Sequence, residues 1–179
     1  MFTHVFRLDH APDEVLAAHR DGLVGFGPSL PGVASVERLT TVASDRAVHL
    51  AHRWYGDPGC LPRLLRSVVP ADRFVWHDRS TWTQDGGTWA ITIDVLGPGP
   101  HLSGSHRFLP AADGGCEVVL EASVLGLALG GDILGVPLGR WGARVLERLV
   151  HDMLAGVAEA STTRIAEWMS GRRDRDLAA

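Results

Sequence analysis

The chain has 179 residues, enough for one domain with a sizeable core, and its 45% hydrophobic and 21% charged residues are ordinary for a globular protein. Its net charge of −4 argues against a general nucleic-acid-binding surface. All 17 basic residues are Arg, which excludes Schiff-base chemistry, a phosphate-loop Lys and a Lys general base.

The cysteines and the hydropathy pattern predict a cytoplasmic protein. Cys60 and Cys116 lack the spacing of a zinc site, and we interpret both as free thiols in a reducing compartment. Residues 1–5 do not place a positive region before an apolar run, so we expect no signal peptide. No stretch approaches the ~20 uninterrupted apolar residues of a membrane span.

Residues 1–32 predict one strand and one or two short helices. Residues 3–8 have the character of a short strand. A helix is expected to begin at residues 11–14, because Pro12 suits its first turn and Asp13 and Glu14 suit its positive end. Glycine and proline interrupt residues 22–32, so at most one further short helix fits there.

From Val33 onward the hydrophobic period becomes two, which is typical of strands. We expect strands at 33–42, 46–55, 73–83, 88–96, 102–109 and 116–125. Asp-Gly-Gly at 85–87 and at 113–115 is a hairpin signal, and strands joined by tight turns favour an antiparallel meander.

The last third predicts one long amphipathic helix. Apolar residues at 146, 149, 150, 153, 154 and 157 recur at intervals of three and four. We expect this helix from about Arg140 to Ser170, with Gly171 as its stop. The sequence therefore predicts a single domain over 1–171 and a polar, frayed tail over 172–179.

This order of elements resembles the START-like (SRPBCC) superfamily, which includes pollen-allergen-like proteins, aromatic polyketide cyclases and ubiquinone-binding proteins. The chain is most similar to an uncharacterised branch of it from high-GC bacteria, through Leu61-Pro62, Trp76 or Trp82, and Val136-Pro137-Leu138-Gly139. The resemblance implies an α+β helix-grip fold, in which a curved seven-stranded antiparallel sheet wraps around a long C-terminal helix. START-like families share no universal catalytic motif, so no residue role is carried over.

A curled sheet that a helix covers only in part leaves a pocket on its concave side. Strand alternation predicts which side chains face it. The expected ligand-binding residues are Leu50, His52, Trp54, Trp76, Asp78, Ser80, Trp89, Ile91, His106, Phe108, Leu120 and Met153. A register shifted by one residue would place His49, Arg53, His77 and Arg79 there instead.

Four polar side chains share this otherwise apolar face: His52, Asp78, Ser80 and His106. They either satisfy one another and buried water, bind the polar head of a ligand, or catalyse acid–base chemistry, for which His52, Asp78 and His106 are the candidates. Two His and one carboxylate also suit a metal. We expect none, because the three residues come from separate strands without local spacing.

Two segments between the main elements are candidates for a lid and a gate. The segment from Cys60 to Pro70 has apolar residues at helical spacing, with Arg63 and Arg66 off that stripe. It is expected either to close the pocket mouth or to touch an anionic membrane transiently. The glycine-rich segment 126–142 predicts a flexible connection opposite this lid.

The sequence thus predicts binding or carriage of a hydrophobic small molecule, such as a lipid, a quinone or a polyketide-like compound, with no cofactor. The alternatives are an aromatase/cyclase that acts on a polyketide-like substrate by His/Asp acid–base chemistry, and a regulatory or interaction module. The six tryptophans are expected either to pack in the core or to form flat walls that bind a ligand. The expected partner is the ligand and not nucleic acid; the sequence does not determine the oligomeric state.

Overall fold

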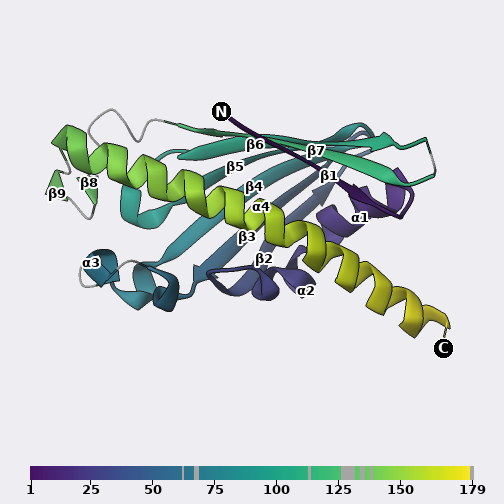
Figure 1. Ribbon diagram of the computed structural model, residues 1–179, viewed down its shortest axis with the longest axis horizontal. Helices are drawn as coiled ribbons and strands as arrows, with labels where there is room; N and C mark the ends of the chain where they lie inside the picture. The colour runs from purple at the N-terminus through teal and green to yellow at the C-terminus, as the bar shows by residue number, and fades with distance from the viewer. Residues whose placement is uncertain are drawn as a thin grey trace.

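The computed structural model describes residues 1–61, 63–66, 69–112, 114–125, 132–133, 136–137 and 139–177. Within these ranges a curved seven-stranded antiparallel sheet lies against one long helix, α4 (Gly139–Leu177), which runs along the concave side of the sheet (Figure 1). This arrangement confirms the helix-grip fold that the order of elements predicted.

The strands follow the predicted runs closely. They are β1 (Phe2–Leu8), β2 (Val33–Ala43), β3 (Val48–Gly56), β4 (Val75–Thr83), β5 (Gly86–Ile93), β6 (Leu102–Pro110) and β7 (Cys116–Val124). Strands β2 to β7 pair in sequence order, and β1 pairs with β7, so β1 and β2 form the two edges. Residues 94–96, expected to extend a strand, form a 3-10 helix, η4 (Asp94–Leu96), instead.

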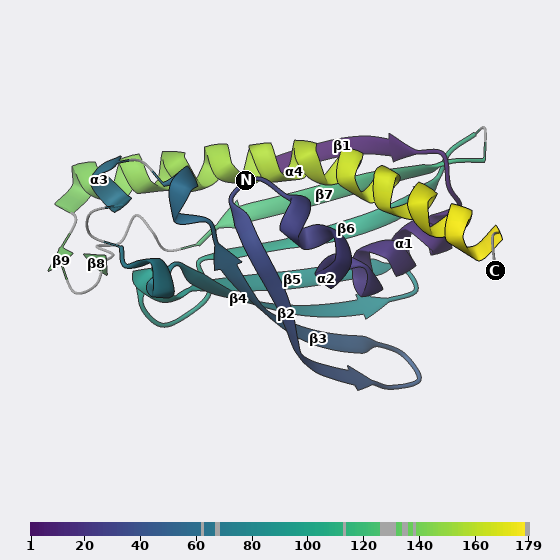
Figure 2. The same ribbon diagram turned by 90° about the horizontal axis from the view of Figure 1, so that it is seen from below.

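Short helices cover part of the concave face beside α4. Helix α1 (Pro12–Asp21) packs on β6 and β7, and α2 (Leu23–Phe26) packs on β2 (Figure 2). The remaining elements are η1 (Gly27–Ser29), η2 (Pro58–Cys60), α3 (Arg63–Arg66), η3 (Ala71–Arg73), β8 (Asp132–Ile133) and β9 (Val136–Pro137). As expected, Pro12 occupies the first turn of α1, with Asp13 and Glu14 next to it.

Helix α4 is longer than the sequence suggested, because it continues through Gly171 to Leu177. A glycine ends a helix when its backbone turns to positive φ. Gly171 does not adopt positive φ, so it is an ordinary helical residue that costs about 1 kcal/mol relative to Ala. The residues expected to form a frayed tail are therefore helical as far as Leu177.

The C-terminal half of α4 is held by the main core. Ile165 and Met169 are buried there in one core cluster with Val15 and Ala18 of α1. Next to them the Trp168 ring lies against α2, where a Cβ added to Gly25 would stand 2.8 Å from the indole nitrogen. The glycine lets the helices approach closely at this point.

Truncating the buried side chain of Ile165, which is 1% exposed, tests this anchor. We expect Ile165→Ala to lower the free energy of unfolding by about 2 to 5 kcal/mol, because it leaves a cavity where α4 meets α1. Urea denaturation measures the change. The control is Thr163→Ala on the exposed side of the same helix, for which less than about 0.5 kcal/mol is expected; equal losses in both variants would contradict the anchor.

Candidate functional site

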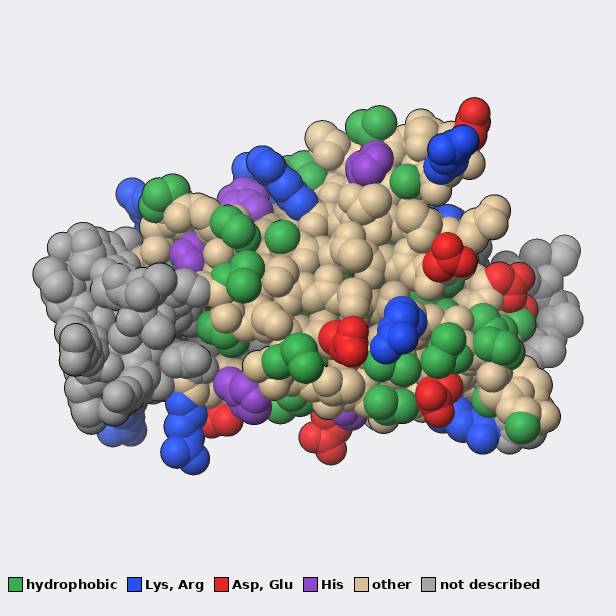
Figure 3. Space-filling model, turned by 90° about the horizontal axis from the view of Figure 1, so that it is seen from above, with side chains coloured by type: hydrophobic (Ala, Val, Ile, Leu, Met, Phe, Trp, Pro, Cys, Tyr) green, Lys and Arg blue, Asp and Glu red, His purple; other side chains and the backbone are tan. Residues whose placement is uncertain are grey.

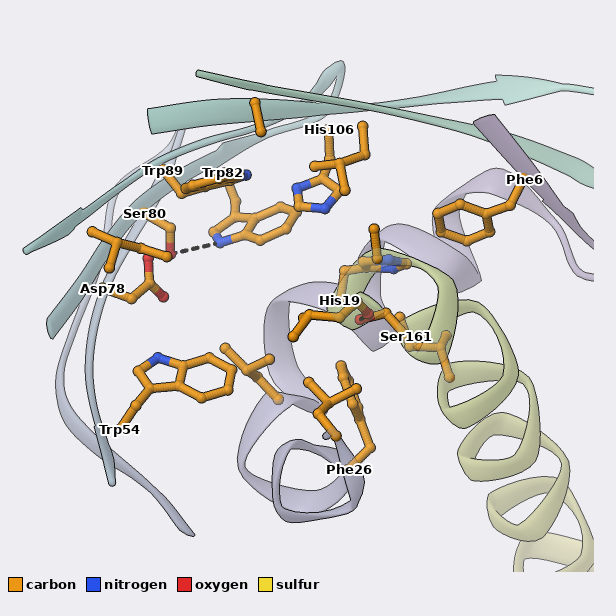
Figure 4. Close-up of a pocket in the computed structure, with 18 of the residues that line it drawn as sticks. Phe6, His19, Phe26, Trp54, Asp78, Ser80, Trp82, Trp89, His106 and Ser161 are labelled. Carbon is orange, nitrogen blue, oxygen red and sulfur yellow. Dashed lines mark hydrogen bonds between the residues drawn. The ribbon is translucent and has the colours of Figure 1, made fainter. Parts of the chain in front are cut away.

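A cavity of about 160 Å³ lies between the concave face of the sheet and helices α1, α2 and α4 (Figure 4). Its wall is mostly aromatic and aliphatic. The described residues that line it are Phe2, Phe6, His19, Leu23, Phe26, Leu30, Trp54, Asp78, Ser80, Trp82, Trp89, Ile91, His106, Leu120, Ala122, Val157, Ala158, Ser161 and Ile165.

The sheet accommodates two of the large indole rings by pairing each with a glycine. Trp82 of β4 lies opposite Gly87 of β5, and Trp89 of β5 lies opposite Gly104 of β6. A Cβ at Gly87 would collide with the Trp82 ring, and one at Gly104 with the Trp89 ring. The absence of these two side chains lets both indoles lie against the sheet, which forms the flat wall of the cavity.

The polar groups of β3 and β4 gather at one end of the cavity. Asp78 is 6% exposed, and its Oδ2 accepts a hydrogen bond of 3.2 Å from Nδ1 of the fully buried His52. Beside it the Trp82 indole N–H donates to the Ser80 hydroxyl at 3.0 Å. The cross-strand register causes the first contact, because His52 and Asp78 are directly opposite each other in the β3–β4 ladder.

Several buried polar atoms of the cavity wall have no hydrogen-bond partner among the described residues. They are Trp54 Nε1, Asp78 Oδ1, Trp89 Nε1 and His106 Nδ1. Removing a polar group from water without a new partner is costly, and most buried polar atoms in proteins are paired. Buried water or a bound molecule can supply the partners of such atoms.

Two histidines face the cavity away from the Asp78 end. Burial lowers the pKa of His19 to about 4, although its hydrogen bond to the Val15 carbonyl opposes this shift. Burial, with a smaller contribution from neighbouring His19, lowers the pKa of His106 to about 3. The two rings lie 5.3 Å apart between centroids, and both are neutral at neutral pH.

The structure brings seven of the predicted ligand-binding residues to the cavity wall: Trp54, Asp78, Ser80, Trp89, Ile91, His106 and Leu120. The other five predicted residues are not among those that line the cavity. His52 supports Asp78, Trp76 stacks on Trp54 at 5.9 Å, and Phe108 packs against His19. Leu50 is buried in β3, and the side chain of Met153 lies outside the described part of the structure.

Residues of the helices were missing from the predicted site. His19 and Phe26 come from α1 and α2, and Ser161 comes from α4. His19 lies four residues after Val15 on the buried side of α1, which was the only signal in the sequence. Alternation along a strand reveals its own inner face, but not which helical residues are packed opposite.

The outer face of the sheet carries the side chains that a shifted register would have turned inward. His49 and Arg79 are exposed there, where His49 Nδ1 donates to or accepts from the Thr81 hydroxyl at 3.0 Å. A hollow of about 580 Å³ lies between β2, β3 and β4 on this side, partly lined by the exposed Leu39 and Val42. Basic, acidic and His side chains are interspersed on the surface seen from above (Figure 3).

The predicted lid contains α3, one helical turn long. The Arg66 guanidinium binds back onto its own loop, donating to the carbonyls of Gly59 at 2.6 Å and Leu61 at 2.9 Å. The side chains of Leu64 and Leu65, and residues 62, 67 and 68, lie outside the described part. Most of the predicted gate also lies outside it, apart from the backbone of the short β8–β9 ladder and the first residues of α4.

Within the described ranges, no group of three or more His, Cys, Asp or Glu side chains is arranged to hold a metal ion. Nor does any described helix combine the length and hydropathy that a membrane span needs. Cys60 and Cys116 are unpaired.

Known structures share this architecture, whereas no protein-family model and no curated protein sequence matches the chain. An aromatase/cyclase from Streptomyces sp. R1128 is 15% identical, with a TM-score of 0.57 over 96% of this chain and 93% of that one. A STAR-related lipid transfer protein from Xanthomonas axonopodis is 19% identical, with a TM-score of 0.54 over 91% and 84%. Norcoclaurine synthase from Thalictrum flavum is 13% identical, with a TM-score of 0.53 over 93% and 84%.

At these low sequence identities the similarities show the fold alone. Together with the sheet topology, they define the fold class. The chain has the START-like helix-grip fold. The resemblance stated from the sequence is thereby confirmed at the level of the fold.

The two cavity histidines predict that the protein loses stability in acid. In the unfolded chain a histidine binds its proton near pH 6.5, whereas native His19 and His106 bind theirs only near pH 4 and pH 3. Their contribution to stability is therefore complete above pH 6.5 and is lost as the pH falls toward these values. Urea denaturation from about pH 7 to about pH 4 measures the free energy of unfolding. We expect this free energy to fall less steeply with pH in His106→Gln than in the unchanged protein. Equal pH dependence in the two proteins would contradict the assignment.

Proposed function

We propose that the chain binds a compact, largely apolar small molecule in the cavity between the sheet and α4. The observation that carries the proposal is the aromatic cavity itself, whose wall contains four buried polar atoms that have no hydrogen-bond partner in the described part of the chain. Ligand sites are typically apolar pockets with a few well-placed polar groups, as here. Neighbours in fold include a lipid transfer protein and an aromatase/cyclase, and both names are consistent with an apolar ligand.

The size of the cavity narrows the kind of ligand. A dry cavity of roughly 150 Å³ in another protein holds one benzene molecule. The cavity here, about 160 Å³, is therefore suited to one ring or two fused rings. Among the predicted ligands, a ring compound of the polyketide type fits these described walls better than an extended lipid chain.

Intrinsic fluorescence provides a direct binding assay, because Trp54, Trp82 and Trp89 all line the cavity. We expect a bicyclic aromatic such as 1-aminonaphthalene to change tryptophan emission on binding. Ala158→Leu places three more carbon atoms in the cavity and should weaken binding by at least about tenfold, by the loss of roughly 1.4 kcal/mol or more. Ala158 is 2% exposed.

The matched control is Glu159→Leu, which adds the same side chain at the neighbouring, exposed position of α4. It should bind like the unchanged protein. Circular dichroism and thermal unfolding establish that both variants are folded. If Ala158→Leu folds and binds normally, or if native mass spectrometry and thermal shift find no small molecule that binds, the proposal fails.

A second candidate function is acid–base catalysis on the bound molecule. The observation that favours it is the orientation of Asp78, whose Oδ2 is held by His52 while Oδ1 has no partner among the described residues. A carboxylate fixed in this way is suited to accept a proton from a ligand, and a carbon acid next to a ketone is a suitable substrate class. The aromatase/cyclase and norcoclaurine synthase that share the fold are enzymes by name.

Substituting Asp78 and His52 distinguishes an enzyme from a carrier. If the protein is an enzyme, Asp78→Ala and His52→Ala lose turnover of an enolisable aromatic ketone by roughly 100-fold or more while ligand binding persists. If it is a carrier, neither the unchanged protein nor the variants turn over the ketone, and the substitutions change only its affinity. Turnover is followed by the ketone's absorbance, and binding by tryptophan emission.

We also retain two predictions about where the protein acts. Free Cys60 and Cys116 are consistent with a reducing cytoplasm. Transient contact of the segment from Cys60 to Pro70 with an anionic membrane would depend mainly on the exposed Arg63, because Arg66 is bound to the carbonyls of its own loop.

A further inference from the structure

The cavity wall has an uneven distribution of charge. Its titratable side chains, among the described residues that line it, are Asp78 of β4, His19 of α1 and His106 of β6. No arginine lies in this set. The two histidines are neutral at neutral pH, because burial lowers the pKa of each to about 4 or below. The wall therefore offers no cation to a bound anion, and it presents one carboxylate.

The unpartnered atoms also define a hydrogen-bond pattern. Trp54 Nε1 and Trp89 Nε1 can only donate, whereas Asp78 Oδ1, as part of a carboxylate, accepts. Figure 4 shows Trp54 and Asp78 at the same end of the cavity, with Trp89 beside them on the sheet. A ligand atom that both donates and accepts would satisfy a donor and an acceptor of this end together.

A hydroxyl group on a flat ring meets these requirements. Its O–H donates to Asp78 Oδ1, its oxygen accepts from an indole N–H, and its ring lies against the aromatic wall. A carboxylate of the same size does not meet them, because it brings a second negative charge next to Asp78 in a site with few compensating groups. A plain hydrocarbon ring fits the wall but leaves the buried polar atoms unpaired.

We propose that the cavity is selective for neutral, hydroxylated aromatic rings, with Asp78 as the specificity-determining residue, and that it excludes carboxylates such as free fatty acids. This inference rests on the proposed binding function and specifies the class of its ligand. Asp78 acts by touching the ligand hydroxyl through Oδ1, while His52 holds the other carboxylate oxygen in place.

Three probes of nearly the same shape test the selectivity: naphthalene, 2-naphthol and 2-naphthoate, each titrated calorimetrically at neutral pH. A hydrogen bond to a charged group predicts that 2-naphthol binds about tenfold to 100-fold more tightly than naphthalene. 2-Naphthoate should bind at least about tenfold more weakly than 2-naphthol. Equal affinity for naphthalene and 2-naphthol would overturn the inference and leave the proposed function standing, whereas failure of all three to bind would refute both.

The variant Asp78→Asn identifies the residue responsible. It removes the negative charge while retaining the size of the side chain, so 2-naphthoate should gain at least about tenfold in affinity and the preference for 2-naphthol should shrink. Retained binding of naphthalene shows that the variant is folded and its cavity is intact. The matched control is Asp94→Asn, which removes the same charge from a side chain that contacts His77 outside the cavity wall, and it should leave all three affinities unchanged. If Asp94→Asn alters selectivity as much as Asp78→Asn, or if Asp78→Asn leaves it unchanged, the assignment to Asp78 is wrong.

Discussion

The packing of α4 across a curved sheet is the constraint on which the other features depend. Ile165 and Met169 hold the C-terminal half of the helix against α1 and the core. Where the helix faces the middle of the sheet it presents small side chains, Ala158 and Ser161, toward the cavity. A straight helix cannot stay in contact with a curved sheet along its whole length. Side chains therefore fill the space between them at one end and leave a cavity farther along.

That hollow explains why polar groups survive in an apolar interior. His52 and Asp78 would be costly in a filled core, yet they satisfy each other in part and leave Asp78 Oδ1 without a partner among the described residues. Burial keeps His19 and His106 uncharged, so the site combines an aromatic surface, neutral imidazoles and one carboxylate. The same arrangement is compatible with selective binding and with proton transfer, which differ in whether the bound molecule carries a proton acidic enough for Asp78 to remove.

Much of this site could be predicted from strand alternation. The period of two along β3 and β4 places His52, Trp54, Asp78 and Ser80 on one face, and the structure has them there. The pairing of Trp89 with Gly104 was not predicted, because the register between two strands depends on turn geometry and on both strands together. His19 was missed for a related reason, since a helical position gives no indication of which strand it packs against.

The sequence by itself determined the elements, their order and the side chains that each strand turns inward, because these follow from local propensity and from the periods of strands and helices. It also determined the absence of lysine and the presence of six tryptophans. Only the tertiary structure decided that Asp78 Oδ1 lacks a hydrogen-bond partner within the described ranges, that Trp82 and Trp89 lie against glycines, and that α1 contributes His19. These properties depend on distances between groups far apart in the chain, which packing sets and local patterns do not encode.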